Sequence, residues 1–193
     1  TDNSIAFLLD LSSSTNAVVT ADGKRIIEIQ KEALLLISEA VSATGDNFAI
    51  YGYSGFGRDQ VAFYIAKDFD EPWNHVSAAR VGQLNWKMEN RDGAAIRHCA
   101  RKLSKAPGKR KIMALISDGE PLDCGCADYR DAYARADTKR ALLEARQIGL
   151  IPFCITVDPY GGEYLDDMLG PGRYIVLDDS PRLPEVLPKI IAT

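Results

Sequence analysis

The 193-residue chain lacks the features of several large protein classes. It is slightly acidic, with 23 Lys and Arg residues against 27 Asp and Glu, whereas a nucleic-acid-binding domain needs a basic face. No apolar run approaches the roughly 18 residues that cross a bilayer. Strand-like sequence also begins too early to leave room for a signal peptide. We therefore expect a cytoplasmic protein that binds neither nucleic acid nor membrane.

Cysteine is scarce as well. The four cysteines are too few and too scattered for a disulfide framework. Cys99 and Cys154 lie in apolar patterns, which predicts buried, reduced thiols. Cys124 and Cys126 are separated by one residue, not by the two that are usual in zinc and redox motifs, and no second ligand pair follows. The sequence does not favour a metal or redox role for them.

The motifs of nucleotide binding and covalent catalysis are also missing. The chain has no Gly-x-x-x-x-Gly-Lys-Ser/Thr loop, and no Gly-x-Gly-x-x-Gly leads from a strand into a helix. Gly55-x-Gly57 precedes a predicted strand, which is a hairpin signal. No Ser/His/Asp nucleophile arrangement is supported. We expect a binding module, not an enzyme.

What is present is the composition of an ordinary globular domain. Hydrophobic residues make up 46% of the chain and charged residues 26%. A chain of this length is large enough to bury one core. We expect a single domain over residues 1–193. The opening Thr-Asp-Asn, without an initiator methionine, suggests that this domain was excised from a longer protein.

Strand-like and helix-like segments alternate along the chain. Apolar runs predict strands at 5–11, 47–54, 61–67, 111–117, 151–157 and 174–177. Helical spacing predicts helices at 25–41, 75–81, 93–103, 137–147 and 183–191, and Asp137 is the expected N-cap of the fourth. The polar stretch 124–136 is ambiguous. The element order also includes a helix between the last two strands, to which we assign no bounds.

This order predicts an α/β fold. The connection at residues 55–59 is too short for a parallel crossover, so the second and third strands should form an antiparallel hairpin. We predict a doubly wound, mostly parallel six-stranded sheet in the order 3-2-1-4-5-6, with strand 3 antiparallel and helices on both faces. In such sheets, binding sites lie beyond the C-terminal ends of the strands.

Oxygen-bearing side chains follow the first and fourth predicted strands at that edge. Asp10-x-Ser12-x-Ser14 lies where the first strand ends, and Asp118 follows the fourth. Alternate residues of a strand point to one side, so these oxygens can converge. Clustered carboxylate and hydroxyl oxygens suit a hard divalent cation such as Mg²⁺. The set is incomplete as a cage and needs further ligands, from elsewhere in the chain or from a partner.

These motifs resemble a known family. Asp10-x-Ser12-x-Ser14 and Ser117-Asp118-Gly119 are similar to the first and third motifs of the metal ion-dependent adhesion site (MIDAS) of von Willebrand factor A (VWA) domains. The resemblance implies that the two hydroxyls of the first motif bind the metal directly and that the two carboxylates act mainly through bound water. An acidic residue of a partner would complete the coordination. Mg²⁺ is the implied cofactor, with Mn²⁺ or Ca²⁺ as alternatives.

The second motif of the family departs from its usual form in this chain. The family has a loop threonine shortly before a helix, and the corresponding position here is Asn90. Asn90 offers a carbonyl oxygen, and Asp92 nearby offers a carboxylate, so either residue is a candidate ligand. The metal-site residues implied by the resemblance are Asp10, Ser12, Ser14, Asn90, Asp92 and Asp118.

Within the family, residues 92–98, 117–121 and 137–146 look most like the branch of NorD and CbbO type proteins. Members of that branch act with MoxR-class AAA+ ATPases as adaptors that activate nitric oxide reductase and Rubisco, respectively. The resemblance implies an adaptor domain from the C-terminal part of a longer protein. It would grip an acidic residue of a client enzyme through the metal, within a MoxR-type assembly.

Two other functions fit parts of the pattern. Aspartyl phosphatases also place an Asp at the end of the first strand, but they need a general acid two residues later, where this chain has Ser12. A structural module with a vestigial site is the other alternative, because Asp-x-Ser-x-Ser can also form a polar turn or a helix N-cap. A magnesium-dependent rise in melting temperature would argue against the vestigial site, and turnover of an aryl phosphate would support the phosphatase.

Several other conspicuous residues have plainer interpretations. Glu120 and Asp123 are expected to be solvated loop acids, with a water-mediated approach to the metal as the alternative. His98 is expected at the surface. Trp73 and Trp86 are expected to pack under the long segment 68–92.

Overall fold

A mixed sheet organises the protein. The computed structural model describes residues 2–57, 59–119 and 131–177, and within them the sheet has six strands. They are β1 (Asn3–Asp10), β2 (Asn47–Gly55), β3 (Val61–Lys67), β4 (Arg110–Ser117), β5 (Ile151–Thr156) and β6 (Tyr174–Val176). Their order is β3-β2-β1-β4-β5-β6; β3 runs antiparallel to β2 and the other neighbours are parallel. The predicted fold class, strand order and hairpin are confirmed.

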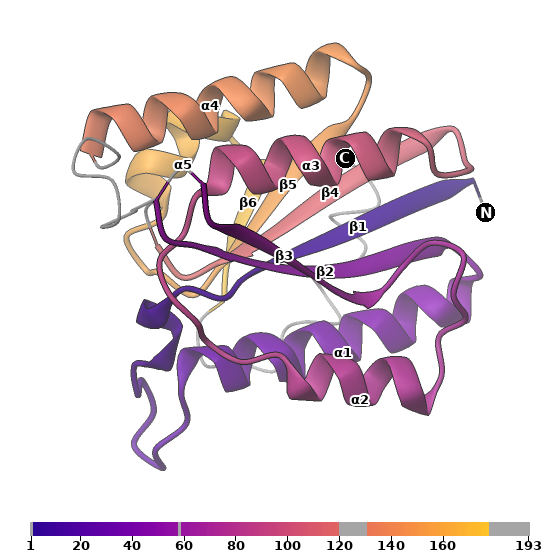
Figure 1. Ribbon diagram of the computed structural model, residues 1–193, viewed down its shortest axis with the longest axis horizontal. Coiled ribbons are helices and arrows are strands. Elements are labelled where there is room, and N and C mark those ends of the chain that lie inside the picture. The colour runs from indigo at the N-terminus through magenta and orange to yellow at the C-terminus, as the bar shows by residue number, and fades with distance from the viewer. Residues whose placement is uncertain (1, 58, 120–130, 178–193) are drawn as a thin grey trace.

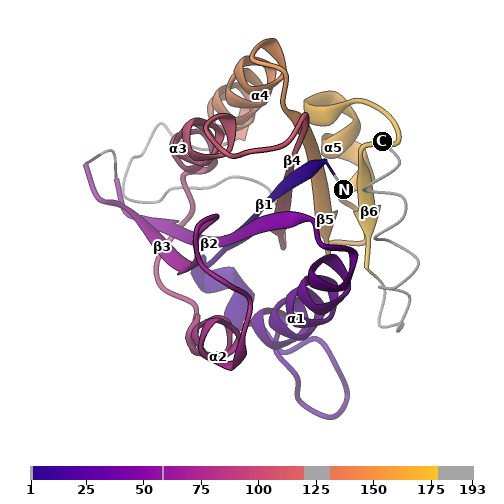
Figure 2. The same ribbon diagram turned by 90° about the vertical axis from the view of Figure 1, so that its right-hand side faces the viewer.

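Helices cover both faces of this sheet (Figures 1 and 2). One face carries α1 (Ile26–Thr44) and α2 (His75–Gln83), and the other carries α3 (Asp92–Ser104), α4 (Asp131–Gln147) and α5 (Gly162–Leu169). A short 3-10 helix, η1 (Ser13–Asn16), follows β1. Among the described residues, none of the helices combines the length and the apolarity that a bilayer crossing needs.

The side chains of β1 alternate between two hydrophobic cores. Ile5, Phe7 and Leu9 pack with α1, whereas Ala6 and Leu8 pack with α3 and α4. All five are fully buried. Because both faces are covered, the strand needs apolar residues at every position, which is why it reads as a continuous apolar run. The same alternation puts the last residue of β1 on the α3 side of the sheet.

Two helices differ from the prediction or refine it. α4 begins at Asp131, six residues earlier than predicted, so Asp137 lies inside the helix and is not its N-cap. The first turns of α4 are mostly exposed, with Ala134 the buried exception among the side chains described there, and an exposed turn has no apolar stripe to detect. The helix between β5 and β6 is α5. The predicted helix at 183–191 lies outside the described residues.

The buried face of α1 can be tested with two leucines of opposite exposure. Leu34 is fully buried, whereas Leu36 is 61% exposed. Leu34→Ala should lower the free energy of unfolding by about 2–5 kcal/mol, because it leaves a cavity under the sheet. Leu36→Ala should change it by less than about 0.5 kcal/mol. Urea unfolding followed by circular dichroism measures both, and equal losses would contradict the placement of this helix face.

Candidate metal site

The ends of two neighbouring parallel strands bring the predicted acids together. β1 pairs directly with β4, so Asp10 at the end of β1 and Asp118 just after β4 lie at one edge of the sheet. The Asp118 side chain lies near Ser14 and Asp10, and interactions with both act on the pKa of its carboxyl. Two neighbouring buried carboxyl groups cannot both be ionised without a large cost unless a positive charge is supplied.

The first motif forms a compact loop that is buried at its start and exposed at its second serine. The backbone N–H of Ser12 donates to Asp10 Oδ1 at 2.7 Å, and the Oγ atoms of Ser12 and Ser14 are 2.8 Å apart. Asp10 and Ser12 are buried, whereas Ser14 is exposed. Ser12 stands at the N-cap of η1, yet its side chain makes no capping hydrogen bond. The N-cap interpretation of the motif therefore does not explain the Ser12 hydroxyl.

The second loop reaches the same place. The Asn90 side-chain amide donates to Asp10 Oδ2 at 3.1 Å, so Asn90 contacts the first motif directly. Asp92 lies in the first turn of α3 and accepts a hydrogen bond from the Tyr53 hydroxyl at 2.8 Å. Asn90, Asp92 and Tyr53 are all buried. The structure thus assembles all six predicted site residues at one edge, with Asn90 against Asp10 and Asp92 held by β2.

Backbone hydrogen bonds fix the second loop to its neighbours. Lys87 N–H donates to the Leu11 carbonyl at 2.7 Å, and Ser13 N–H donates to the Met88 carbonyl. Gly55 and Glu89 exchange N–H···O bonds at 2.9 and 3.0 Å. Sequence reasoning did not predict the pairing of Gly55 with Glu89 or the bond from Tyr53 to Asp92, because both are contacts between distant segments. The only available signal for the role of Tyr53 would have been the pairing register of β1 and β2, which places Tyr53 opposite Asp10.

Three carboxyl groups share this buried edge, and each holds its proton more tightly than usual. Burial, followed by the charges of Asp118 and Asp92, raises the pKa of Asp10 well above its usual range. Burial is also the main cause that raises the pKa of Asp118, and it raises the pKa of Asp92 to about 7. The negative charge here is therefore poorly compensated, which is the environment that a bound cation would stabilise.

The acids alone are not arranged as a cage. Within the described residues, no group of three His, Cys, Asp or Glu side chains is placed to hold a metal ion by itself. A cation at this edge would therefore need the serine hydroxyls as ligands. Hydroxyl and carboxylate oxygens are suitable donors for Mg²⁺, Mn²⁺ or Ca²⁺.

A glycine lets α4 pack against the start of α3. A Cβ atom at Gly93 would overlap the Asp137 carboxylate. Arg97, one turn further along α3, donates to Asp137 Oδ1 at 2.8 Å and to Glu144 Oε2 at 2.7 Å. Two of the segments that carry the predicted family resemblance, 92–98 and 137–146, therefore meet here. Their contact supports the turn of α3 that holds Asp92.

The other sequence expectations have mixed outcomes. Cys99 and Cys154 are buried free thiols, and His98 is exposed, as predicted. Trp73 packs on Phe48 with ring centroids 5.6 Å apart, but Trp86 is 39% exposed and is not packed under the segment as predicted. The remaining candidates lie outside the described residues: Glu120, Asp123, Cys124 and Cys126.

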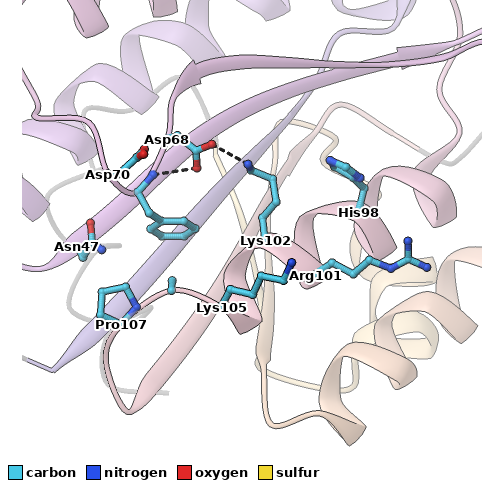
Figure 3. A pocket seen from close by; sticks show the side chains of 10 residues that line it. Asn47, Asp68, Asp70, His98, Arg101, Lys102, Lys105 and Pro107 are labelled. Carbon is cyan, nitrogen blue, oxygen red and sulfur yellow. Dashed lines mark hydrogen bonds and ion pairs between the residues drawn. The ribbon is translucent and has the colours of Figure 1, made fainter.

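A separate hollow of about 690 Å³ lies near the opposite end of the sheet (Figure 3). It is lined by the start of β2, the loop after β3 and the end of α3. Asp68 on its wall accepts hydrogen bonds from Lys102 Nζ at 2.6 Å and from Phe69 N–H at 2.9 Å. This ion pair ties α3 to the loop after β3. None of the six predicted site residues lines the hollow.

Comparison with known proteins agrees with this fold. An uncharacterized protein of Pseudomonas aeruginosa is 40% identical over 186 residues, which is 96% of this chain and 30% of that protein. Protein NorD of Stutzerimonas stutzeri is 38% identical over 178 residues, which is 92% of this chain and 29% of that protein. The PilB minor pilin from Streptococcus sanguinis shares the fold, with a TM-score of 0.70 at 13% identity over 98% of this chain and 60% of that one.

The chain spans about 30% of the length of the curated relatives that it matches. The predicted relationship to NorD proteins is confirmed at the level of this domain. The sequence profile of the von Willebrand factor type A domain matches residues 4–188. Because that match covers nearly all of the chain, the chain belongs to the von Willebrand factor type A domain family.

Proposed function

We propose that this domain binds a divalent cation, Mg²⁺ first among them, and uses it to grip an acidic residue of a partner protein. The observation that carries the proposal is the pair of serine hydroxyls, 2.8 Å apart, beside the buried Asp10 carboxyl, which accepts hydrogen bonds from the Ser12 N–H and the Asn90 amide. Hard oxygen donors of this kind suit such a cation. Its charge would offset the negative charge that burial concentrates at this edge.

The residues divide into direct and indirect ligands. Ser12 and Ser14 would bind the cation through their hydroxyls, whereas Asp10 and Asp118 would act mainly through bound water. Ser14 is exposed, so the open side of the site faces solvent, where a partner can approach. Because few negatively charged ligands would bind the cation directly, it would attract an incoming carboxylate more strongly. The bound cation would supply that electrostatic attraction.

Asn90 is the better candidate for the second-loop group next to the cation. Its amide already contacts Asp10, whereas the Asp92 carboxylate is engaged by Tyr53. Asp92 would add negative charge that attracts the cation from a short distance. The departure from the family threonine would then change the type of oxygen that is offered, without removing the loop from the site.

We further propose that the domain is a cytoplasmic adaptor and not an enzyme. The resemblance to the NorD and CbbO branch supports a MoxR-type AAA+ ATPase as one partner and a metabolic enzyme, of the nitric oxide reductase or Rubisco type, as the client. Homology to NorD over 92% of the chain supports the choice of branch. The phosphatase alternative is weakened because the residue two positions after Asp10 is a serine, which cannot act as the general acid.

Magnesium binding is the first test. Calorimetry should show one site in the wild-type domain, and Mg²⁺ should raise its melting temperature. Asp10→Ala should abolish binding, because it removes the buried carboxylate around which the other groups are arranged. Asp22→Ala is the control, because Asp22 is an exposed acid in the loop before α1. Equal affinity in wild type and Asp10→Ala would refute the site, and turnover of an aryl phosphate would revive the phosphatase.

The second loop gives a sharper test. Asn90→Leu should weaken Mg²⁺ binding by about tenfold or more, because a buried amide that holds Asp10 is lost. Asp92→Asn should cost less, because it keeps the shape of the side chain and a partner for Tyr53. Calorimetric titration of both variants decides the order. A larger loss for Asp92→Asn would make Asp92 the ligand, and two unchanged affinities would remove the second loop from the site.

Client activation tests the adaptor function itself. In a reconstituted mixture of client enzyme, ATPase and the full-length protein, a chelator or the double substitution Ser12→Ala with Ser14→Ala should stop activation. The double variant should still unfold cooperatively. Ser13→Ala is the matched control, because Ser13 is exposed and bonds to the second loop through its backbone. Full activation by the double variant would mean that the client does not bind through the proposed metal site.

A further inference from the structure

An open groove lies beside the candidate metal edge, between the β2–β3 hairpin and the connection from α2 to α3. Figures 1 and 2 show that connection passing the ends of β2 and β3. The groove has a volume of about 540 Å³. Its walls come from both segments and include Ser54, Val61, Tyr64, Trp86, Lys87 and Met88.

Two large apolar side chains of the groove are exposed to water. Trp86 is 39% exposed and Met88 is 53% exposed, and both line the groove together with the ring of Tyr64. Single exposed apolar residues are ordinary on protein surfaces. Trp, Tyr and Met gathered around one concavity are typical of protein-binding surfaces, where they act as anchors or adaptable contacts.

The groove and the metal loop are one hydrogen-bonded unit. The Met88 carbonyl accepts from Ser13 N–H, between the two serines of the first motif. Met88 N–H in turn donates to Ser54 Oγ at 3.0 Å, which ties the same residue to β2. The backbone of Met88 therefore joins the groove wall to the loop that would hold the cation. A partner seated on one surface necessarily lies next to the other.

The apolar lining and the strand order of the groove indicate the shape of its occupant. Lys87 Nζ lies 5.7 Å from the centre of the Tyr64 ring, and Asp59 also lines the groove, so the lining carries one charge of each sign. β3 is the edge strand of the described sheet, and Val61, Ala62 and Tyr64 from this strand line the groove. An edge strand is a template for an extended segment. An extended, partly apolar segment matches the groove, and the proposed cation beside the groove accounts for an acidic residue in that segment.

We propose that the groove and the metal edge together bind one extended segment of the client, and this inference rests on the proposed function. An Asp or Glu of the segment reaches the cation, while a Leu, Met or Phe a few residues away in the extended segment fills the groove. The metal edge then selects the acid, and the groove selects its neighbours. Two weak contacts on one segment give a specificity that one carboxylate cannot.

The experiment uses fluorescein-labelled dodecapeptides of Gly and Ser that carry one Glu and one Leu, with the spacing varied from one to five residues. Polarisation titrations with the wild-type domain in saturating Mg²⁺ should show a best spacing. At that spacing, replacing Leu by Ser should weaken binding by about tenfold, the value of burying one such side chain. Replacing Glu by Gln, or adding chelator, should abolish binding.

A double variant separates the groove from the cation. Trp86→Ser with Met88→Ser should lose the leucine-dependent gain and retain both Mg²⁺ affinity and the weaker glutamate-dependent binding, because the backbone bonds of Met88 remain. Leu36→Ser with Ile148→Ser is the matched control, because these residues are 61% and 57% exposed at other places on the surface. The control should bind as the wild type does.

The outcomes distinguish the two proposals. Two results would contradict binding in the groove and leave the metal site supported. In the first, glutamate binding needs Mg²⁺ but leucine adds no affinity. In the second, the affinity gained from leucine persists in the groove variant. Binding that needs leucine but not Mg²⁺ overturns the metal grip, and with it the single shared segment. A peptide series that does not bind at any spacing overturns the inference for linear segments, while Mg²⁺ calorimetry continues to test the cation site alone.

Discussion

The fully buried carboxyl of Asp10, at the end of the central strand, sets the conditions for the whole sheet edge. A carboxylate removed from water needs hydrogen bonds and positive charge. Here the backbone of Ser12 and the amide of Asn90 supply the hydrogen bonds, while the nearest charges are two further acids. Proton uptake relieves the repulsion in one way and a divalent cation relieves it in another. The loops converge on Asp10 because each supplies part of what its burial requires.

That convergence makes the surroundings of the site dependent on one another. Asn90 belongs to the same connection as Met88, and Met88 joins the first motif to β2 through its backbone. On the other side, Asp92 is held by Tyr53, and the start of α3 is supported by the close approach of Asp137 to Gly93. A change in the connection that carries Asn90 would reach the Asp10 carboxyl through one hydrogen bond.

The fold was largely predictable because its main determinants are local. A strand buried on both faces has an apolar residue at every position, and strand ends marked by Asp10 and Asp118 locate the candidate functional edge. The start of α4 was missed because its first turns are mostly exposed, which leaves no apolar stripe. The contact of Tyr53 with Asp92 and the groove around Trp86 were not predicted, for another reason. Their roles arise from contacts between segments far apart in sequence, which no periodicity records.

The two ends of the sheet carry their acids in different ways, and the difference bears on function. Near one end, Asp68 is half-buried and already paired with Lys102 Nζ at 2.6 Å, so its charge is neutralised within the chain. At the other end, Asp10, Asp92 and Asp118 act on one another as like charges. At the proposed metal site, a lysine in place of the cation would neutralise that edge permanently and leave nothing for a partner to bind. A bound cation, which is not part of the chain, would also attract an incoming carboxylate, so an open, acidic edge of this kind would suit reversible binding of a partner.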